Sequence, residues 1–198
     1  MSTRAELAGR TRSDLLAAAK RLFAERGYLD TKITDIAAAA GRAAGSFYSH
    51  FSGKEQLLTA LRSELAETAA PGPAGDDAIR EHVTACWTAM RIHRPTVIAL
   101  LQSAIAAAPA SGRLWHELTT RTAPLRRQLE DLRDRGEPLP GDPELLAAAV
   151  GAMLAVLNHA LPTDDGRVAD TVTNLVLYGL AGPRVGADAS DAENRTSR

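Results

Sequence analysis

The chain has 198 residues, 45% of them hydrophobic and 24% charged, which is typical of a folded domain and not of a disordered chain. No segment offers about 18 consecutive strongly apolar residues, and the charged amino terminus does not match a secretory signal, so we expect a cytoplasmic protein without a membrane span. A single cysteine, Cys86, excludes an internal disulfide framework and any site built from paired cysteines.

Charge is distributed unevenly along the chain. Residues 1–62 carry ten Lys and Arg against six Asp and Glu, whereas residues 63–198 have a net charge of −5. All the lysines, Lys20, Lys32 and Lys54, lie in the first part. This split prompts a search for a polyanionic partner of the amino-terminal part, although solvated helix faces also show such an excess.

Alanine and leucine dominate the chain, and no segment alternates apolar and polar residues over the length of a strand, so we expect an all-α fold. In the first part, Ser13 can cap a helix that Gly27 ends, and Gly41 separates two short helical segments. A longer segment follows, with leucines at helical spacing. The expected bounds of these helices are 13–27, 31–40, 44–51 and 53–70.

Helix-breaking residues cluster only at 71–75, where prolines and glycines alternate, so we place the domain boundary there. The amino-terminal domain then spans residues 10–70 and the larger carboxy-terminal domain residues 76–182. Residues 183–198 are polar and lack large apolar side chains, so we expect a disordered tail.

The carboxy-terminal domain reads as further helices, which brings the expected total to about nine. Pro124 should kink or split one of them, because proline lacks the amide donor and clashes with the preceding turn. Asp142 is a good cap for the helix that opens with Pro143. The expected bounds are 76–94, 95–108, 111–135, 143–161 and 164–180.

The two short segments around Gly41 suit a helix-turn-helix. Ile36 of the first and Phe47 and Phe51 of the second can form a small core with the preceding helix. The opposite face of the second segment is then free to turn outward, and its residues are small: Ala43, Ala44, Ser46 and Ser49. Small side chains let a helix approach a DNA groove closely.

The run from Thr31 to Leu57, with Gly45-Ser46-Phe47-Tyr48, His50-Phe51 and Lys54-Glu55, resembles the DNA-binding domain of TetR-family transcriptional regulators. Together with the segment from Leu16 to Gly27, the resemblance covers roughly residues 10–65. It implies a small helix-turn-helix domain followed by a larger helical domain that binds a ligand and dimerises.

The resemblance also implies which residues contact DNA. Tyr48, His50 and Lys54 correspond to phosphate contacts, and a phenol, an imidazole and an ammonium are all suitable donors. The alternatives are that Tyr48 packs on the fold, that His50 hydrogen-bonds to the backbone and that Lys54 pairs with Glu55 or a nearby acid. The full predicted set is Thr31, Lys32, Thr34, Arg42, Ala43, Ala44, Ser46, Tyr48, His50 and Lys54.

This chain departs from the family pattern just after the turn glycine. The family generally has an aliphatic residue and then a capping hydroxyl, where this chain has Arg42 and Ala43. Loss of such a cap costs about 1 kcal/mol. Arg42 either offsets the lost cap with a phosphate contact or only extends its side chain across the small core to reach solvent. The sequence does not decide between the two.

In this family the last two helices dimerise as a four-helix bundle and the middle helices enclose a ligand. Apolar residues on 143–161 and 164–180 fit such a dimer or, equally, a core within one chain. The residues Leu114-Trp115 and the helix ending at Gly136 also look distantly like the branch containing the mycobacterial repressor of ethionamide activation. The predicted ligand contacts are Trp87, Met90, Trp115, Leu118, Met153 and Asn158.

Taken together, the sequence predicts a homodimeric, ligand-responsive repressor that binds a two-fold duplex DNA operator, responds to a small apolar or amphipathic effector, and needs no membrane, metal or cofactor. A helical ligand-binding module that acts through protein partners is one alternative. An all-helical enzyme is another, although the chain has no Gly-x-Ser-x-Gly, no phosphate loop and no zinc-ligand spacing.

Overall fold

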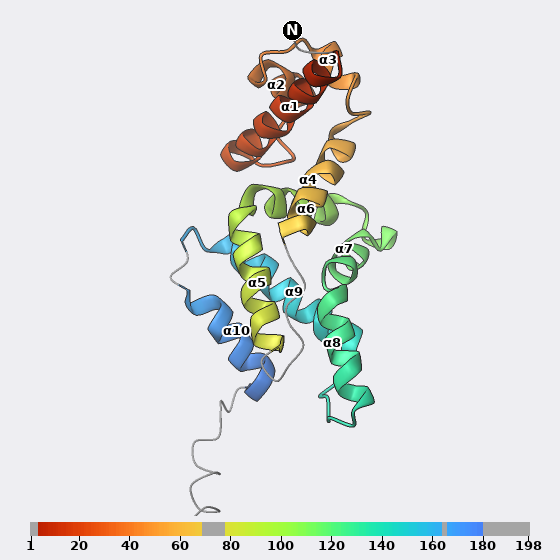
Figure 1. Cartoon of the computed structure of the whole chain (residues 1–198), viewed down its shortest axis with the longest axis vertical. Helices are drawn as coiled ribbons and strands as arrows, with labels where there is room; N and C mark the ends of the chain where they lie inside the picture. Colours follow the sequence, from red (N-terminus) through yellow and green to blue (C-terminus); the bar gives the residue numbers. More distant parts are fainter. Residues whose placement is uncertain (1–3, 69–77, 164–165, 180–198) are drawn as a thin grey trace, which may run out of the picture.

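The computed structural model describes residues 4–68, 78–163 and 166–179 of the chain. Within these ranges the regular elements are ten α-helices and one short 3-10 helix, with no strand. Figure 1 shows helices α1 to α3 at one end of an elongated molecule and α4 leading from them into a larger helical domain. The all-α prediction is confirmed.

The amino-terminal domain is built from α1 (Arg4–Arg26), α2 (Ile33–Ala39), α3 (Ala44–Tyr48) and α4 (Lys54–Thr68). As predicted, α1 ends before Gly27, whose φ of 84° lies in the left-handed region that glycine adopts without strain. The predicted start at Ser13 is wrong, because the helix begins at Arg4. The preceding residues are mostly alanine, leucine, glutamate and arginine, which favour a helix and supply no stop signal.

The small core predicted for this domain is confirmed. Ile36, Ala37 and Phe47 are at most 1% exposed, and Phe51 is 2% exposed. α2 and α3 have seven and five residues, so neither would be stable alone and packing must hold them in place. The buried residues that α1 and α4 add to the core include Leu15, Leu16, Leu22, Phe23, Leu57, Leu58 and Leu61.

The amino-terminal domain packs mainly against one helix of the larger domain. Both α1 and α4 pack against α6 (Arg94–Ala106). The predicted boundary at 71–75 and the predicted tail at 183–198 lie outside the described residues. The structure shows the junction as the packing of α1 and α4 on α6, together with ion pairs from Glu55 and Arg62 of α4 to Arg113 and Glu117.

Helix α9 is the centre of the larger domain, since it packs against α5, α6, α7, α8 and α10. The predicted effect of Pro124 is confirmed: the segment 111–135 splits at Thr122, and Pro124 lies in the first turn of the new helix, where its missing amide is tolerated. The other elements are α5 (Ala78–Ile92), η1 (Pro109–Ser111), α7 (Arg113–Arg121), α8 (Ala123–Asp134), α9 (Pro143–Ala160) and α10 (Arg167–Tyr178).

Both ends of α9 are capped by side chains. As predicted, the Asp142 carboxylate accepts a hydrogen bond from the backbone N–H of Leu145, at 3.0 Å. At the other end, Arg94 donates to the carbonyl of Asn158 at 2.9 Å, and Arg91 donates to the carbonyls of Leu161 at 3.1 Å and Pro162 at 3.2 Å. Two guanidinium groups thus satisfy carbonyls that the helix leaves without an internal partner.

Helix α9 is also the one helix in the described part of the chain with the length and mean hydropathy, 1.3, to cross a membrane. The helix still falls short of about 18 consecutive strongly apolar residues, because it contains Glu144, Asn158 and His159. Of the 18 residues, 44% are buried inside the structure, as in a helix at the centre of a folded domain. Leu145 and Val156 nevertheless point outward, with 59% and 57% exposure.

Candidate nucleic-acid interface

The outer face of the helix-turn-helix is open. Gly41, with a φ of 67°, makes the turn between α2 and α3. α3 buries Phe47 on its inner side, whereas Ala43, Ala44 and Ser49 are exposed and Ser46 is half-buried. The prediction of small outward residues agrees with this arrangement. The helix itself is shorter than predicted, because it ends at Tyr48 and not at Phe51.

Tyr48 is the large side chain of this face. It is 59% exposed, and its ring meets that of Phe47 edge to face at a centroid distance of 5.6 Å. His50 is half-buried beside it. The phenol of Tyr48 is therefore held against the core at its base and open to solvent at its tip, which suits a donor to a phosphate oxygen.

Ala43 behaves as its departure from the family pattern suggests, whereas Arg42 does not. Ala43 occupies the cap position of α3 and provides no side-chain hydrogen bond there. The Arg42 guanidinium forms an ion pair with Asp14 of α1, at 3.0 Å. This pair ties the turn to α1, an arrangement that neither of the two sequence interpretations included.

Three predicted DNA contacts lie at the start of α2, and the structure buries one of them, Thr31, and exposes the other two. Thr31 is 1% exposed, and its hydroxyl donates to the carbonyl of Gly27 at 2.7 Å. Its side chain is therefore unable to reach DNA in this conformation, and we remove it from the predicted contact set. Lys32 and Thr34 are exposed, as a contact with DNA requires.

Lys54 has a role that its sequence position does not reveal. Its ammonium donates to the carbonyls of Tyr28 at 2.6 Å and Thr31 at 2.9 Å, and lies 3.4 Å from that of Leu29. It also lies 4.2 Å from the centroid of the Tyr28 ring. Burial lowers the pKa of Lys54. The alternative interpretation, a pairing with Glu55 or a nearby acid, is not what holds this side chain, and the predicted phosphate contact would have to compete with these carbonyls.

Arg12 is a further basic residue at this face that the sequence did not single out. Its guanidinium lies 5.3 Å from the centroid of the Phe51 ring, just beyond α3, and the residue is exposed. The positive net charge of residues 1–62 was the available signal, but charge alone could not show that α1 extends far enough to bring Arg12 beside α3.

The amino-terminal domain resembles known proteins in sequence. The family described as "Bacterial regulatory proteins, tetR family" matches residues 15–61. The chain is 43% identical over 63 residues to the HTH-type transcriptional regulator TtgR of Pseudomonas putida, and 51% identical over 47 residues to the HTH-type transcriptional repressor KstR2 of Rhodococcus jostii. These matches span 30% and 23% of those relatives and 32% and 24% of this chain.

The same assignment extends to the whole fold. The TetR-family regulator PfmR from Thermus thermophilus superposes with a TM-score of 0.66 and 26% identity, covering 84% of this chain and 98% of that one. A regulatory protein of the tetR family from Rhodococcus reaches a TM-score of 0.69 at 23% identity, which supports the fold alone. Residues 15–61 therefore form a DNA-binding domain of the TetR type, and the whole chain has the fold of TetR-family regulators. The prediction that it is not an enzyme agrees with these relatives, which are described as transcriptional regulators.

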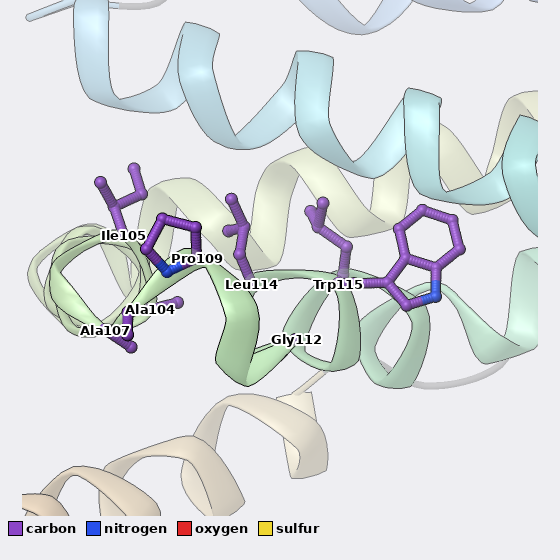
Figure 2. Close-up of a pocket in the computed structure, with 9 residues that line it drawn as sticks. Ala104, Ile105, Ala107, Pro109, Gly112, Leu114 and Trp115 are labelled. Atoms are coloured by element: carbon purple, nitrogen blue, oxygen red, sulfur yellow. The ribbon is translucent and has the colours of Figure 1, made fainter.

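The larger domain of this chain has an apolar groove between α6, η1 and α7 (Figure 2). Its volume of about 380 Å³ is within the range of small-molecule sites. Leu118 lines it together with Trp115, whose side chain is 46% exposed. The groove lining also includes Ala104, Ile105, Ala107, Pro109, Gly112 and Leu114.

The structure does not bring the other predicted ligand contacts to this groove. Trp87 and Met90 are 3% and 2% exposed and belong to the core. Met153 is half-buried and packs against the same core. Asn158 is fully buried, and its Oδ1 lies 3.5 Å from a guanidinium nitrogen of Arg91. The groove residues of α6 and η1 gave no signal in the sequence, because alanines and a proline on a loop predict nothing specific.

Proposed function

We propose that this TetR-family chain is a homodimeric repressor that binds a two-fold duplex DNA operator and is released by a small apolar or amphipathic molecule. The observation that carries the proposal is the outer face of the helix-turn-helix, where α3 exposes small residues and Tyr48 above a buried Phe47. A short helix of this kind, supported from behind, fits the major groove. Such a protein would act in the cytoplasm, where the DNA is.

The remaining predicted contacts fit a phosphate-binding rim around this face. Lys32 and Thr34 are exposed at the start of α2, and His50 follows α3. Arg42 sits between the two helices, paired with Asp14 across an exposed surface where such pairs contribute little. Exchange of that pairing for a phosphate contact would therefore cost little, which supports keeping Arg42 in the proposed interface.

Exposed apolar side chains on the last two helices support the proposed dimer. Leu145 and Val156 of α9 and Leu177 and Tyr178 of α10 are 38% to 59% exposed. A dimer formed through α9 and α10 would bury these side chains. It would also fix the distance between the two copies of α3. To read one operator, these copies must reach successive major grooves about 34 Å apart.

The proposed effector site is the groove beside α7. A molecule bound there favours the released state if it binds that state more tightly, and a tenfold loss of operator affinity needs a difference of about 1.4 kcal/mol. Two solved neighbours are described as regulators of fatty acid metabolism or degradation, from Clostridium perfringens and Bacillus halodurans. The apolar lining of the groove is compatible with a similarly apolar effector here.

Selection of duplexes from a random pool tests DNA binding directly. We expect the protein to retain a two-fold sequence and to bind it as a dimer. We also expect Lys32→Ala to weaken binding to every duplex and to reduce the salt slope of log K by about 0.9. The matched control is Arg127→Ala, which removes one positive charge from an exposed site on α8.

Retention of no duplex at low salt would argue against the proposal and in favour of a helical module that acts through protein partners. An equal loss of affinity in the Lys32 and Arg127 variants would show that net charge, and not the proposed face, governs binding.

A further inference from the structure

A carboxylate at the start of α4 joins the two domains. Glu55 Oε1 accepts hydrogen bonds from the Tyr28 hydroxyl at 2.6 Å and from the Ser103 hydroxyl at 3.0 Å. Its other oxygen forms an ion pair with Arg113. Tyr28 follows α1, Ser103 lies on α6 and Arg113 is the first residue of α7, so one side chain connects the amino-terminal domain to two elements of the larger domain.

A second bond reinforces the same junction. The backbone N–H of Tyr28 donates to Gln102 Oε1 at 2.8 Å. A Cβ atom added to Gly27 would come within 3.3 Å of the Gln102 amide, so the loop and α6 approach closely. Gln102 and Ser103 are consecutive on α6, so Gln102 binds the segment that follows α1 while Ser103 binds Glu55 at the start of α4.

The effector groove is continuous with this junction. Ser103 precedes Ala104 and Ile105, and Arg113 stands between Gly112 and Leu114, all four of which line the groove. Figure 2 shows Ala104 and Ile105 on one side of the groove and Gly112 and Leu114 on the other. Any change in the separation of α6 from α7 must therefore move Ser103 relative to Arg113. Glu55 binds both of these residues, so such a change would alter its contacts.

On the other side, the junction leads to the DNA-binding helices. The carbonyl of Tyr28 accepts from Lys54, which also holds the carbonyl of Thr31, just before α2. Burial and the neighbouring Glu55 raise the pKa of the Tyr28 phenol, which keeps it protonated as the donor to Glu55. The loop between α1 and α2 is thus fixed from both sides by Lys54 and Gln102.

We propose that Glu55 is the positioning residue through which occupation of the groove is communicated to the helix-turn-helix. The inference rests on the proposed function. A contiguous set of bonds from groove to loop is a physical network that can carry such coupling. Coupling between two binding sites is reciprocal, so DNA binding must also alter the groove. That reciprocity allows a test that needs no effector.

The experiment uses Trp115 in the groove as a reporter. The chain has two tryptophans, and Trp87→Phe leaves Trp115 as the single one. With a duplex selected as above, we expect DNA to shift the emission of Trp115 and its quenching by acrylamide. Glu55→Ala should abolish the shift while the affinity for the duplex stays within about threefold, a change of under 1 kcal/mol.

Glu64→Ala is the matched control. Glu64 lies on the same helix and pairs with Lys20 of α1, so that bridge stays within the amino-terminal domain. The control should keep the Trp115 response, and Arg113→Met, which cuts the junction from the other side, should lose it. Hydrogen exchange of residues 104–118 with and without DNA supplies a second readout that the Trp87 substitution does not affect.

The outcomes separate the two proposals. Failure to retain any duplex contradicts the proposed function. A duplex that binds but leaves Trp115 and the exchange of 104–118 unchanged, or a response that persists in Glu55→Ala, overturns the role of Glu55 and leaves the DNA-binding proposal intact. A response lost equally in Glu64→Ala would show a general loosening of α4 and would also overturn it.

Discussion

The ammonium of Lys54 binds the carbonyls of Tyr28 and Thr31 and lies over the Tyr28 ring. A lysine in this position fastens the loop before α2 to the start of α4. Unpaired carbonyls in a partly buried loop are costly, and hydrogen bonds to charged groups are among the stronger ones. At the scale of single residues, this side chain therefore contributes to the shape of the DNA-binding domain before any DNA is present.

We expect Lys54→Met to lower the free energy of unfolding by about 1–3 kcal/mol, because the carbonyls of Tyr28 and Thr31 lose their donor. Thermal or urea unfolding measures the change. The salt slope of DNA binding should stay close to that of the parent protein. A slope reduced by about one with unchanged stability would instead assign Lys54 to a phosphate.

Gly151 shows a second constraint at the residue scale, on the packing of α9. A Cβ atom there would lie 2.4 Å from Cγ2 of Thr122. Thr122 is buried and donates its hydroxyl to the carbonyl of Leu118 at 2.9 Å, so it is unable to rotate away without losing that bond. The close approach of α9 to the junction of α7 and α8 thus requires glycine.

We expect Gly151→Ala to destabilise the protein by about 1–3 kcal/mol through overpacking. Thr122→Ser removes the clashing methyl and keeps the hydroxyl, so the double variant should recover much of the loss. Unfolding of the two single variants and the double variant measures the coupling. Strictly additive losses would show that the two positions do not interact.

At the scale of elements, α9 is the helix on which the larger domain is assembled, and both of its ends depend on side chains. Asp142 caps the first turn, Arg94 binds the Asn158 carbonyl in the last turn, and Arg91 binds the carbonyl of Leu161 just after the helix. Positive groups at a helix carboxyl end are favourable, as are hydrogen-bond acceptors at the amino end.

We expect Asp142→Ala to cost about 1 kcal/mol, the usual loss for a helix cap. Asp142→Asn keeps an acceptor and should lose much less, which makes it the matched control. Differential scanning calorimetry can measure both variants. Equal losses in the two would indicate that the charge of Asp142, and not its hydrogen bond to Leu145, stabilises the helix.

At the scale of the whole molecule, Glu55 makes the contact between the domains depend on pH. Burial raises the pKa of Glu55, but hydrogen bonds from Tyr28, Arg113 and Ser103 outweigh it, and the pKa is lowered from its ordinary 4.5. A carboxyl with a lowered pKa in the folded state contributes stability that is fully present above its ordinary pKa. That stability is lost as pH falls through the lowered value.

We therefore expect Glu55→Gln to lower the melting temperature at pH 7 only slightly, because the pair with Arg113 is about half exposed, and the difference from the parent to shrink as pH falls below 4.5. Melting curves of both proteins across that range provide the measurement. Glu64→Gln controls for the loss of a charge on α4. A difference that is constant with pH would show that protonation of Glu55 does not weaken the junction.

The sequence by itself determined the local features of this protein. Glycine at the ends of α1 and α2, Pro124 at a break and Asp142 at a cap act within one turn of helix, so each was predictable from its neighbours. The family motif likewise identified the helix-turn-helix from adjacent residues. The start of α1 was missed because residues 4–12 carry no boundary signal.

Only the tertiary structure decided which distant side chains meet. Lys54 contacts the loop before α2, Glu55 contacts residues 27, 48 and 58 positions away, and the groove is lined by α6, η1 and α7. No periodicity or spacing encodes these contacts, because they depend on how whole helices cross. Helix crossing is set by the packing of the entire core, and for that reason Trp87 and Met90 proved to be core residues while Trp115 lines the groove.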